Sequence, residues 1–118
     1  MDLLINTVEN ITTVTCAGRI TFGEGSTMFR DTIQDLVAKK RLRIIIDLGN
    51  VSYIDSTGIC ELTCAWTTVA NAGGKMVLAH LTKRVQDLLQ IVRLYTVFDV
   101  FDTADEAARY LLKNMPKK

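Results

Sequence analysis

The tetrapeptide Asp55-Ser56-Thr57-Gly58 carries side chains that could act chemically at the start of a helix. Asp and Ser favour helix N-termini because their oxygens accept hydrogen bonds from backbone N–H groups that have no intrahelical partner. A serine there can also carry a phosphate, since a helix N-terminus tolerates an anion. Gly58 lowers helix propensity relative to alanine, and it allows close approach by neighbouring backbone or by a partner. The tetrapeptide therefore fits both a plain helix cap and a phosphorylatable switch.

The helix predicted over residues 55–71 distributes its side chains unevenly. At about 100° per residue, the arc that must face the sheet contains Ile59, Leu62, Trp66 and Val69. A flank beside this arc has only small, uncharged side chains, those of Ser56, Cys60, Thr63 and Thr67. Glu61 is the only charged residue of the helix. Because interface cores are depleted in charge, we expect this flank to bind a protein partner, together with Asp55, Thr57 and Gly58.

A phosphate on Ser56 would act on such a complex through charge. It adds about −1.5 to −2 charges near neutral pH, next to the carboxylate of Asp55. An acidic group of the partner about 5 Å away would meet roughly 3 kcal/mol of repulsion per pair of unit charges at an effective dielectric near 20. Half of that repulsion weakens a complex roughly tenfold. Phosphorylation is therefore expected to switch binding off.

Other combinations that could support catalysis, metal binding or nucleotide binding are incomplete. The single histidine, His80, has no partner motif and is expected to be a hydrogen-bonded polar residue at a strand end. Cys60 and Cys64 lie four residues apart, but a metal site needs three or four ligands. Gly23 and Gly25 precede a helix without the full dinucleotide fingerprint. We therefore expect no enzyme activity, no metal site and no cofactor.

Bulk properties narrow the function classes further. The 118 residues have a net charge of +1, which argues against direct nucleic-acid binding. No apolar stretch approaches the ~18 residues of a membrane span, and no signal peptide is recognisable, so no membrane insertion is expected. Three cysteines, an odd number, do not form a disulfide framework and favour a reducing cytoplasm. The basic run at residues 39–43 is interpreted as a helix end.

The pattern of apolar residues predicts one α/β domain over residues 1–118, with a frayed tail at 114–118. A β-hairpin is expected over residues 3–8 and 11–19, followed by a helix capped by Ser26. The unbroken Ile44-Ile45-Ile46 predicts a strand at 43–48 that is covered on both faces. After the helix at 55–71, strands are expected at 75–80 and 97–101 and helices at 82–92, capped by Thr82, and from a capping box of Thr103 and Glu106 onward. The order β-β-α-β-α-β-α-β-α implies a mixed β-sheet with helical cover.

The stretches Ile44-Ile45-Ile46-Asp47-Leu48 and Val51-Ser52-Tyr53-Ile54-Asp55-Ser56-Thr57-Gly58-Ile59 strongly resemble the STAS domain of bacterial anti-sigma factor antagonists. Gly18-Arg19-Ile20 and Asn71-Ala72-Gly73-Gly74-Lys75-Met76-Val77-Leu78 are similar to the ends of two further strands of that family. The order of helices and strands agrees as well. The resemblance therefore covers nearly the whole chain and implies the STAS fold.

The resemblance also implies a mechanism called partner switching. The unphosphorylated antagonist binds an anti-sigma factor that is also a serine kinase, and this frees the sigma factor. The kinase phosphorylates the serine of the motif, here Ser56, and the complex dissociates. A PP2C-type phosphatase then resets the switch. The loop before the first helix often contributes to partner contact in this family, and here its acidic residue is displaced to Glu24.

Two other functions remain open on the sequence alone. The same fold can serve as a STAS subunit or scaffold of a transporter or of a stressosome-type complex. An enzyme or nucleotide-binding domain is the remaining alternative, and the chain offers it neither a phosphate loop nor a paired acid and base.

Overall fold

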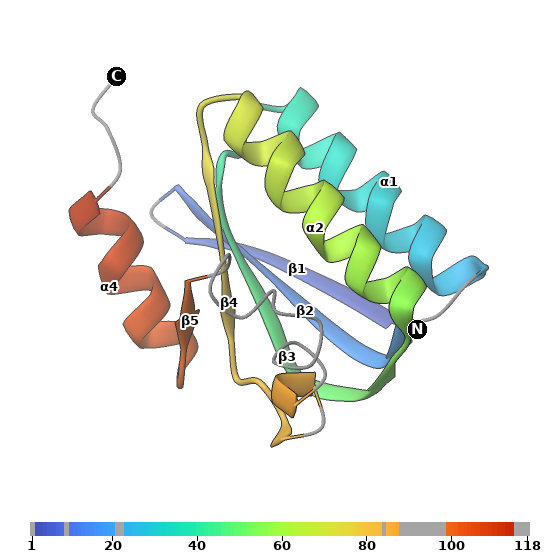
Figure 1. The fold of residues 1–118 in the computed structure, drawn as a ribbon. Coiled ribbons are helices and arrows are strands. Elements are labelled where there is room, and N and C mark those ends of the chain that lie inside the picture. The colour runs from blue at the N-terminus through green and yellow to red at the C-terminus, as the bar shows by residue number, and fades with distance from the viewer. Residues whose placement is uncertain (1, 9, 21–22, 84, 88–98, 115–118) are drawn as a thin grey trace.

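The computed structural model describes residues 2–8, 10–20, 23–83, 85–87 and 99–114. Along the chain, its helices and strands are β1 (Asp2–Val8), β2 (Ile11–Ile20), α1 (Glu24–Ala38), β3 (Arg43–Ile54), α2 (Ser56–Asn71), β4 (Lys75–Ala79), β5 (Val100–Phe101) and α4 (Ala104–Asn114). Strands and helices alternate after an initial hairpin (Figure 1), as the sequence predicts.

The sheet has five strands in the order β1-β2-β3-β4-β5. β1 and β2 pair antiparallel, and the other neighbours pair parallel. The predicted mixed sheet and hairpin are therefore confirmed. Because β2, β3 and β4 are parallel, the segments that leave their carboxyl ends all emerge at one end of the sheet.

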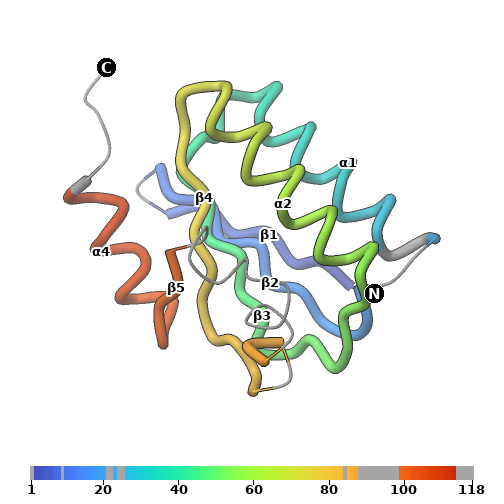
Figure 2. Tube along the Cα trace, viewed as in Figure 1, coloured from blue at the N-terminus to red at the C-terminus, as the bar shows by residue number. Residues whose placement is uncertain are grey.

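Helices cover both faces of the sheet. α1 and α2 lie side by side on one face, whereas α4 lies on the other (Figures 1 and 2). Ile44 and Ile46 of β3 belong to the larger buried cluster with α1 and α2, and Ile45 belongs to a second cluster with Ala107 and Leu111 of α4. All three isoleucines are at most 1% exposed. The prediction of a strand covered on both faces is confirmed.

β3 is longer than the sequence indicates, and the predicted end at residue 48 is wrong. The strand continues to Ile54, and this extension pairs with the end of β2 from Ala17 to Ile20. The pairing passes through two register shifts, between Thr15 and Ala17 and between Gly18 and Arg19. The longer strand brings the end of β2 beside residues 55–58.

The start of α1 also differs from the prediction. The helix begins at Glu24, with Gly23 as N-cap at φ 105°, a backbone conformation that favours glycine. Ser26 is buried inside the first turn, where its hydroxyl donates to the carbonyl of Gly23 at 3.1 Å. Ser26 as N-cap was therefore wrong, because a glycine at positive φ starts the helix three residues earlier.

The remaining elements agree with the sequence where the structure describes them, except that β4 ends at Ala79 and β5 begins at Val100, so His80 and Asp99 lie outside the strands predicted to include them. Thr82 caps a helical segment, since its hydroxyl accepts from the N–H of Val85 at 3.3 Å. The predicted helix at 82–92 extends beyond the described residues, as do the strand residues 97–98 and the tail at 115–118. Thr103 caps α4 by accepting from the N–H of Glu106 at 3.1 Å. Among the described residues, none of the helices is both long and apolar enough to span a membrane.

Candidate functional site

The junction between β3 and α2 is capped by Asp55. Its backbone is extended, and its Oδ1 accepts from the N–H of Gly58 at 2.9 Å. The Asp55 carbonyl accepts the first helical hydrogen bond, from the N–H of Ile59 at 3.0 Å. Asp55, and not Ser56, therefore supplies the cap. Ser56 becomes the first residue of the helix, with an exposed side chain.

Gly58 sits where the helix touches the end of β2. It is buried, and a Cβ atom built on it would lie 2.2 Å from the carbonyl oxygen of Ile20 and 2.5 Å from Cγ1 of Ile54. The same Ile20 carbonyl accepts from the N–H of Asp55 at 3.3 Å. Of the two roles that the sequence leaves open, close approach by neighbouring backbone is present. Gly58 is thus buried below the junction, and its lack of a side chain allows the start of α2 to lie against the end of β2.

The first turn of α2 has no acidic residue, and its last turn has no basic one. The positive end of the helix dipole is met by the capping carboxylate of Asp55. The exposed hydroxyl of Ser56 lies one residue further along. An anion added to this hydroxyl would lie at a helix N-terminus, where backbone N–H groups and the dipole stabilise negative charge.

The predicted flank of α2 is accessible. Ser56, Cys60 and Thr67 are exposed, and Thr63 and Thr57 are half-buried. The hydroxyl of Thr63 donates to the carbonyl of Ile59 at 3.0 Å, and that of Thr67 donates to the carbonyl of Thr63 at 3.1 Å. Because these hydroxyl hydrogens are already bonded within the helix, a partner can cover the flank with little loss of hydrogen bonds to water.

The arc beside the flank is buried as expected. Ile59, Leu62 and Val69 are at most 5% exposed, and Trp66 packs against the same core while partly exposed. The periodicity of the sequence therefore predicts the orientation of α2 correctly.

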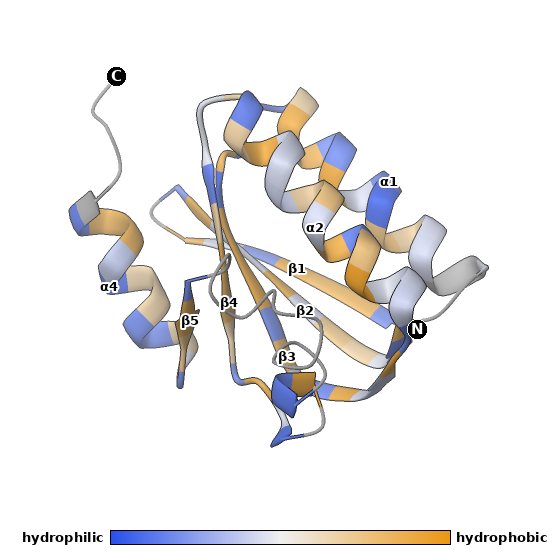
Figure 3. Cartoon of the chain, in the orientation of Figure 1, coloured by the Kyte–Doolittle hydropathy of each residue, from blue (hydrophilic) through white to orange (hydrophobic). Residues whose placement is uncertain are grey.

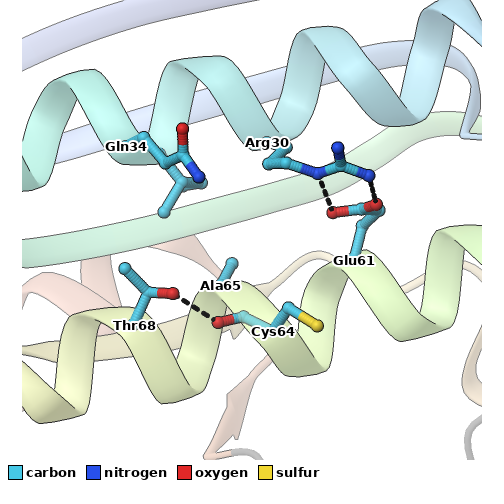
Figure 4. A pocket seen from close by; sticks show the side chains of 7 residues that line it. Arg30, Gln34, Glu61, Cys64, Ala65 and Thr68 are labelled. Carbon is cyan, nitrogen blue, oxygen red and sulfur yellow. Dashed lines mark hydrogen bonds and ion pairs between the residues drawn. The ribbon is translucent and has the colours of Figure 1, made fainter.

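Glu61 is paired across the two helices, and no pattern in the sequence indicates this pair. Glu61 is only 7% exposed. Arg30 of α1 donates from Nε to Oε1 of Glu61 at 3.2 Å and from Nη2 to Oε2 (Figure 4). These bonds raise the pKa of Arg30. A groove of about 300 Å³ between the helices is also lined by Gln34, Cys64 and Thr68. The only charge of α2 is thus neutralised on the side that faces α1.

Glu24, the remaining predicted partner residue, begins α1. The N-terminal ends of α1 and α2 lie at the same end of the molecule (Figure 1). The side chain of Glu24 lies outside the described residues, so its contact with a partner stays a prediction.

The histidine and the three cysteines of the chain differ in their surroundings. Nδ1 of His80 lies 3.0 Å from Oδ2 of Asp47, and Oδ1 of Asp47 accepts from the N–H of Gly49 at 3.0 Å. His80 as a hydrogen-bonded residue at a strand end is confirmed. Burial, and secondarily the charge of Asp47, raises the pKa of Cys16 to about 12. Cys60 and Cys64 are free and exposed.

Comparisons with known proteins agree on one family. The model of the STAS domain matches residues 2–107. BtrV of Bordetella bronchiseptica, which carries the name of an anti-sigma factor antagonist, is 26% identical over 81 residues, covering 69% of this chain and 70% of BtrV. A structure from Thermotoga maritima described by the same role has a TM-score of 0.87 at 19% identity, covering 93% of this chain and 94% of that one. The phosphorylated form of SpoIIAA from Bacillus has a TM-score of 0.73 at 14% identity, covering 92% and 97% of the two chains.

Proposed function

The chain belongs to the STAS domain family, and from that premise we propose that it is an anti-sigma factor antagonist switched by phosphorylation of Ser56. In this proposal the unphosphorylated form binds an anti-sigma factor that is also a serine kinase, which releases the sigma factor. Transfer of phosphate to Ser56 dissociates the complex, and a PP2C-type phosphatase removes the phosphate so that the antagonist can bind again. The naming of BtrV supports the antagonist role, and the phosphorylated state of SpoIIAA supports a modification on this fold.

The observation that carries the proposal is the division of roles at the junction. Asp55 holds the cap, so Ser56 is exposed and its hydroxyl is not needed to start the helix. A kinase can therefore modify Ser56 without unfolding the first turn. The absence of acidic residues from that turn leaves the helix dipole available to stabilise the phosphate.

The partner surface of the proposal comprises Asp55, Ser56, Thr57, Cys60, Thr63 and Thr67, with Gly58 beneath it and Glu24 at its edge. It carries no basic residue that could neutralise a new phosphate. A dianion on Ser56 would enter an interface of small, uncharged groups, where desolvation of charge is costly. Release thus follows from the chemistry of the surface itself and needs no change of fold.

A matched pair of threonines tests this surface. Thr67 and Thr68 are adjacent and exposed, and each hydroxyl donates to the carbonyl four residues earlier. Thr67 lies on the proposed partner surface, and Thr68 lines the groove toward α1. Tagged Thr67→Arg is expected to lose at least about tenfold in affinity for the kinase captured from host cells, equal to ~1.4 kcal/mol. Thr68→Arg should bind as the unmodified protein does.

The nucleotide response completes this test. ATP should release the kinase from the unmodified chain and not from Ser56→Ala. Equal effects of Thr67→Arg and Thr68→Arg would contradict the proposed surface. Capture of transporter or scaffold components without any kinase would instead favour the alternative role, a STAS subunit or scaffold of a transporter or stressosome-type complex.

A further inference from the structure

Two of the three cysteines of the chain are exposed, and both lie on α2. Cys60 and Cys64 are free thiols four residues apart, and residues with this spacing are neighbours on the surface of a helix. The third cysteine, Cys16, is fully buried in the larger core, and burial raises its pKa to about 12. The accessible thiols of the chain are therefore concentrated in one turn of α2.

The surroundings leave both sulfur atoms accessible. The side chains nearest to them along the helix are small, and much of α2 is drawn in colours between hydrophilic and hydrophobic (Figure 3). The hydroxyls of Thr63, Thr67 and Thr68 donate to carbonyls of their own helix. The side chain of Cys64 points toward the N-terminal end of α2 (Figure 4), which is the side on which Cys60 lies. The two sulfur atoms can thus approach one common atom above the helix.

The spacing of this pair disfavours a disulfide and permits a bridging metal. The Cβ atoms of residues four apart in a helix are about 5–6 Å from each other, whereas a disulfide needs about 3.5–4.5 Å. A metal between two thiolates, with metal–sulfur bonds of about 2.3 Å, allows the sulfur atoms to lie up to about 4.6 Å apart. The helix can therefore keep its hydrogen bonds while both cysteines bind one ion.

The number of ligands selects the kind of ion. Among the residues that the structure describes, no group of three or more His, Cys, Asp and Glu side chains could hold a metal. Glu61, the only carboxylate of α2, is bound by Arg30. Zinc takes four ligands in structural sites, so this pair does not suit it. Soft thiolates select Cu(I), and two thiolates are enough for this ion because it forms linear two-coordinate complexes.

We propose that Cys60 and Cys64 together bind one Cu(I) ion, with one sulfur atom on each side of the metal. Each thiol loses its proton on binding, so Cu⁺ and two S–H groups become two protons and a bis-thiolate complex with one negative charge. The site needs no third side chain and no change of fold. It differs from the metal sites that the sequence excludes, because those need three or four ligands.

Metal binding would act on the partner surface of α2, a consequence that rests on the proposed function. Cys60 belongs to that surface and lies one turn after Ser56. The complex adds a negative charge to a flank without charged side chains. Desolvation of this charge beneath a partner is costly, as it is for a phosphate on Ser56. Cu(I) should therefore lower the affinity for the kinase.

Competition with bicinchoninate under anaerobic, reducing conditions measures the site. The protein should withdraw one Cu(I) per chain from the coloured Cu(I)–bicinchoninate complex. Cys60→Ser and Cys64→Ser should each lower the affinity at least about hundredfold, because the second thiolate no longer acts within the same chain. The double variant retains only buried Cys16 and should withdraw none. Thermal midpoints should stay unchanged, since both substituted side chains are exposed.

Cys64→Ser combined with Thr67→Cys is the matched control for spacing. This variant keeps two thiols at exposed positions but separates them by seven residues, about 10.5 Å along the helix, which is too far for one ion to bridge. It should bind Cu(I) as weakly as Cys64→Ser alone. The proposal is overturned by equal affinity of this variant and the unmodified protein, by half a Cu(I) per chain, or by equally tight binding of Zn²⁺.

Kinase capture separates the site from its consequence. Cu(I)–bicinchoninate should weaken capture of the kinase from host cells at least about tenfold for the unmodified chain, and free bicinchoninate should not. Cys60→Ser with Cys64→Ser should capture equally with and without Cu(I). Capture that Cu(I) leaves unchanged, although the titration shows binding, would contradict the effect on the partner surface. Failure to capture any kinase without Cu(I) would contradict the proposed function instead, and the titration would still decide the metal site.

Discussion

The N-termini of α2 and α4 have the same kind of side-chain cap and differ in the residues that follow it. Asp55 and Thr103 each cap their helix by accepting from the N–H three residues later, at 2.9 Å and 3.1 Å. The three positions after the cap are Ser56-Thr57-Gly58 in α2 and Ala104-Asp105-Glu106 in α4. α4 has two acids in this first turn, whereas α2 has none.

In our proposal, this difference separates a structural helix start from one that can be phosphorylated. In α4 the two carboxylates already satisfy the helix dipole, and the hydroxyl at this terminus, that of Thr103, is engaged as the cap. In α2 the first turn has no acidic residue, the cap is the carboxylate of Asp55, and an exposed hydroxyl follows it. The third position differs as well, because Gly58 is pressed against β2 while Glu106 is exposed. The α2 terminus is thus held against β2 by Gly58 while its Ser56 side chain remains exposed.

The largest difference in the free energy of unfolding is expected for substitutions at the third position after the cap, Gly58 in α2 and Glu106 in α4. Gly58→Ala puts a methyl group 2.2 Å from the Ile20 carbonyl, so the junction must move, and the free energy of unfolding should fall by about 3 kcal/mol or more. Glu106→Ala removes only part of a capping box and should cost about 0.5 kcal/mol. Urea denaturation of both variants measures this difference. Similar decreases in the free energy of unfolding for the two variants would show that the close contact at Gly58 does not contribute to stability.

The caps themselves should be equivalent. Asp55→Ala and Thr103→Ala each leave one helical N–H without its partner and should each lower the free energy of unfolding by about 1 kcal/mol. Chemical denaturation gives both values, with Asp55→Asn as a control that retains a capping oxygen. A loss at Thr103 without a loss at Asp55 would mean that Ser56, not Asp55, caps α2 in solution.

The smallest effect concerns charge at the first helical position. Ser56→Asp supplies the anion that the α2 turn lacks and should stabilise the protein by about 0.5 kcal/mol at low salt. Ala104→Asp adds a third acid to the α4 turn and should bring no gain, because like charges repel. The difference between the variants should shrink as salt is added. An equal response at both helices would contradict the prediction that an added anion is stabilised at the N-terminus of α2 and not at that of α4.

Much of this arrangement could be predicted from local patterns. The hairpin, the buried isoleucines of β3 and the inward arc of α2 follow from periodicities of two and 3.6 residues. The exposed flank follows from the same geometry. The family resemblance agrees with the matched family, because its motif spans the junction itself.

The features that escaped prediction depend on distant partners. Gly49 and Asn50 are typical of a turn, yet they continue β3 because the end of β2 lies beside them across two register shifts. Glu61 is buried because Arg30, 31 residues earlier on another helix, is placed to bind both of its oxygens. No spacing within one helix indicates such a pair. The sequence indicates that Gly58 permits a close approach, but it does not indicate which residue approaches. That residue is Ile20, which the pairing of β2 with β3 brings beside Gly58.

The central claim is that Ser56 receives the phosphate, and intact-mass measurement with peptide mapping tests it most directly. The chain is purified from host cells with and without phosphatase treatment, alongside Ser56→Ala and Thr57→Ala. The adjacent hydroxyl of Thr57 is the matched control, since it lies in the same turn and is half-buried. We predict one phosphate on the unmodified chain and on Thr57→Ala, removed by phosphatase, and none on Ser56→Ala. A phosphate that persists in Ser56→Ala would contradict the account.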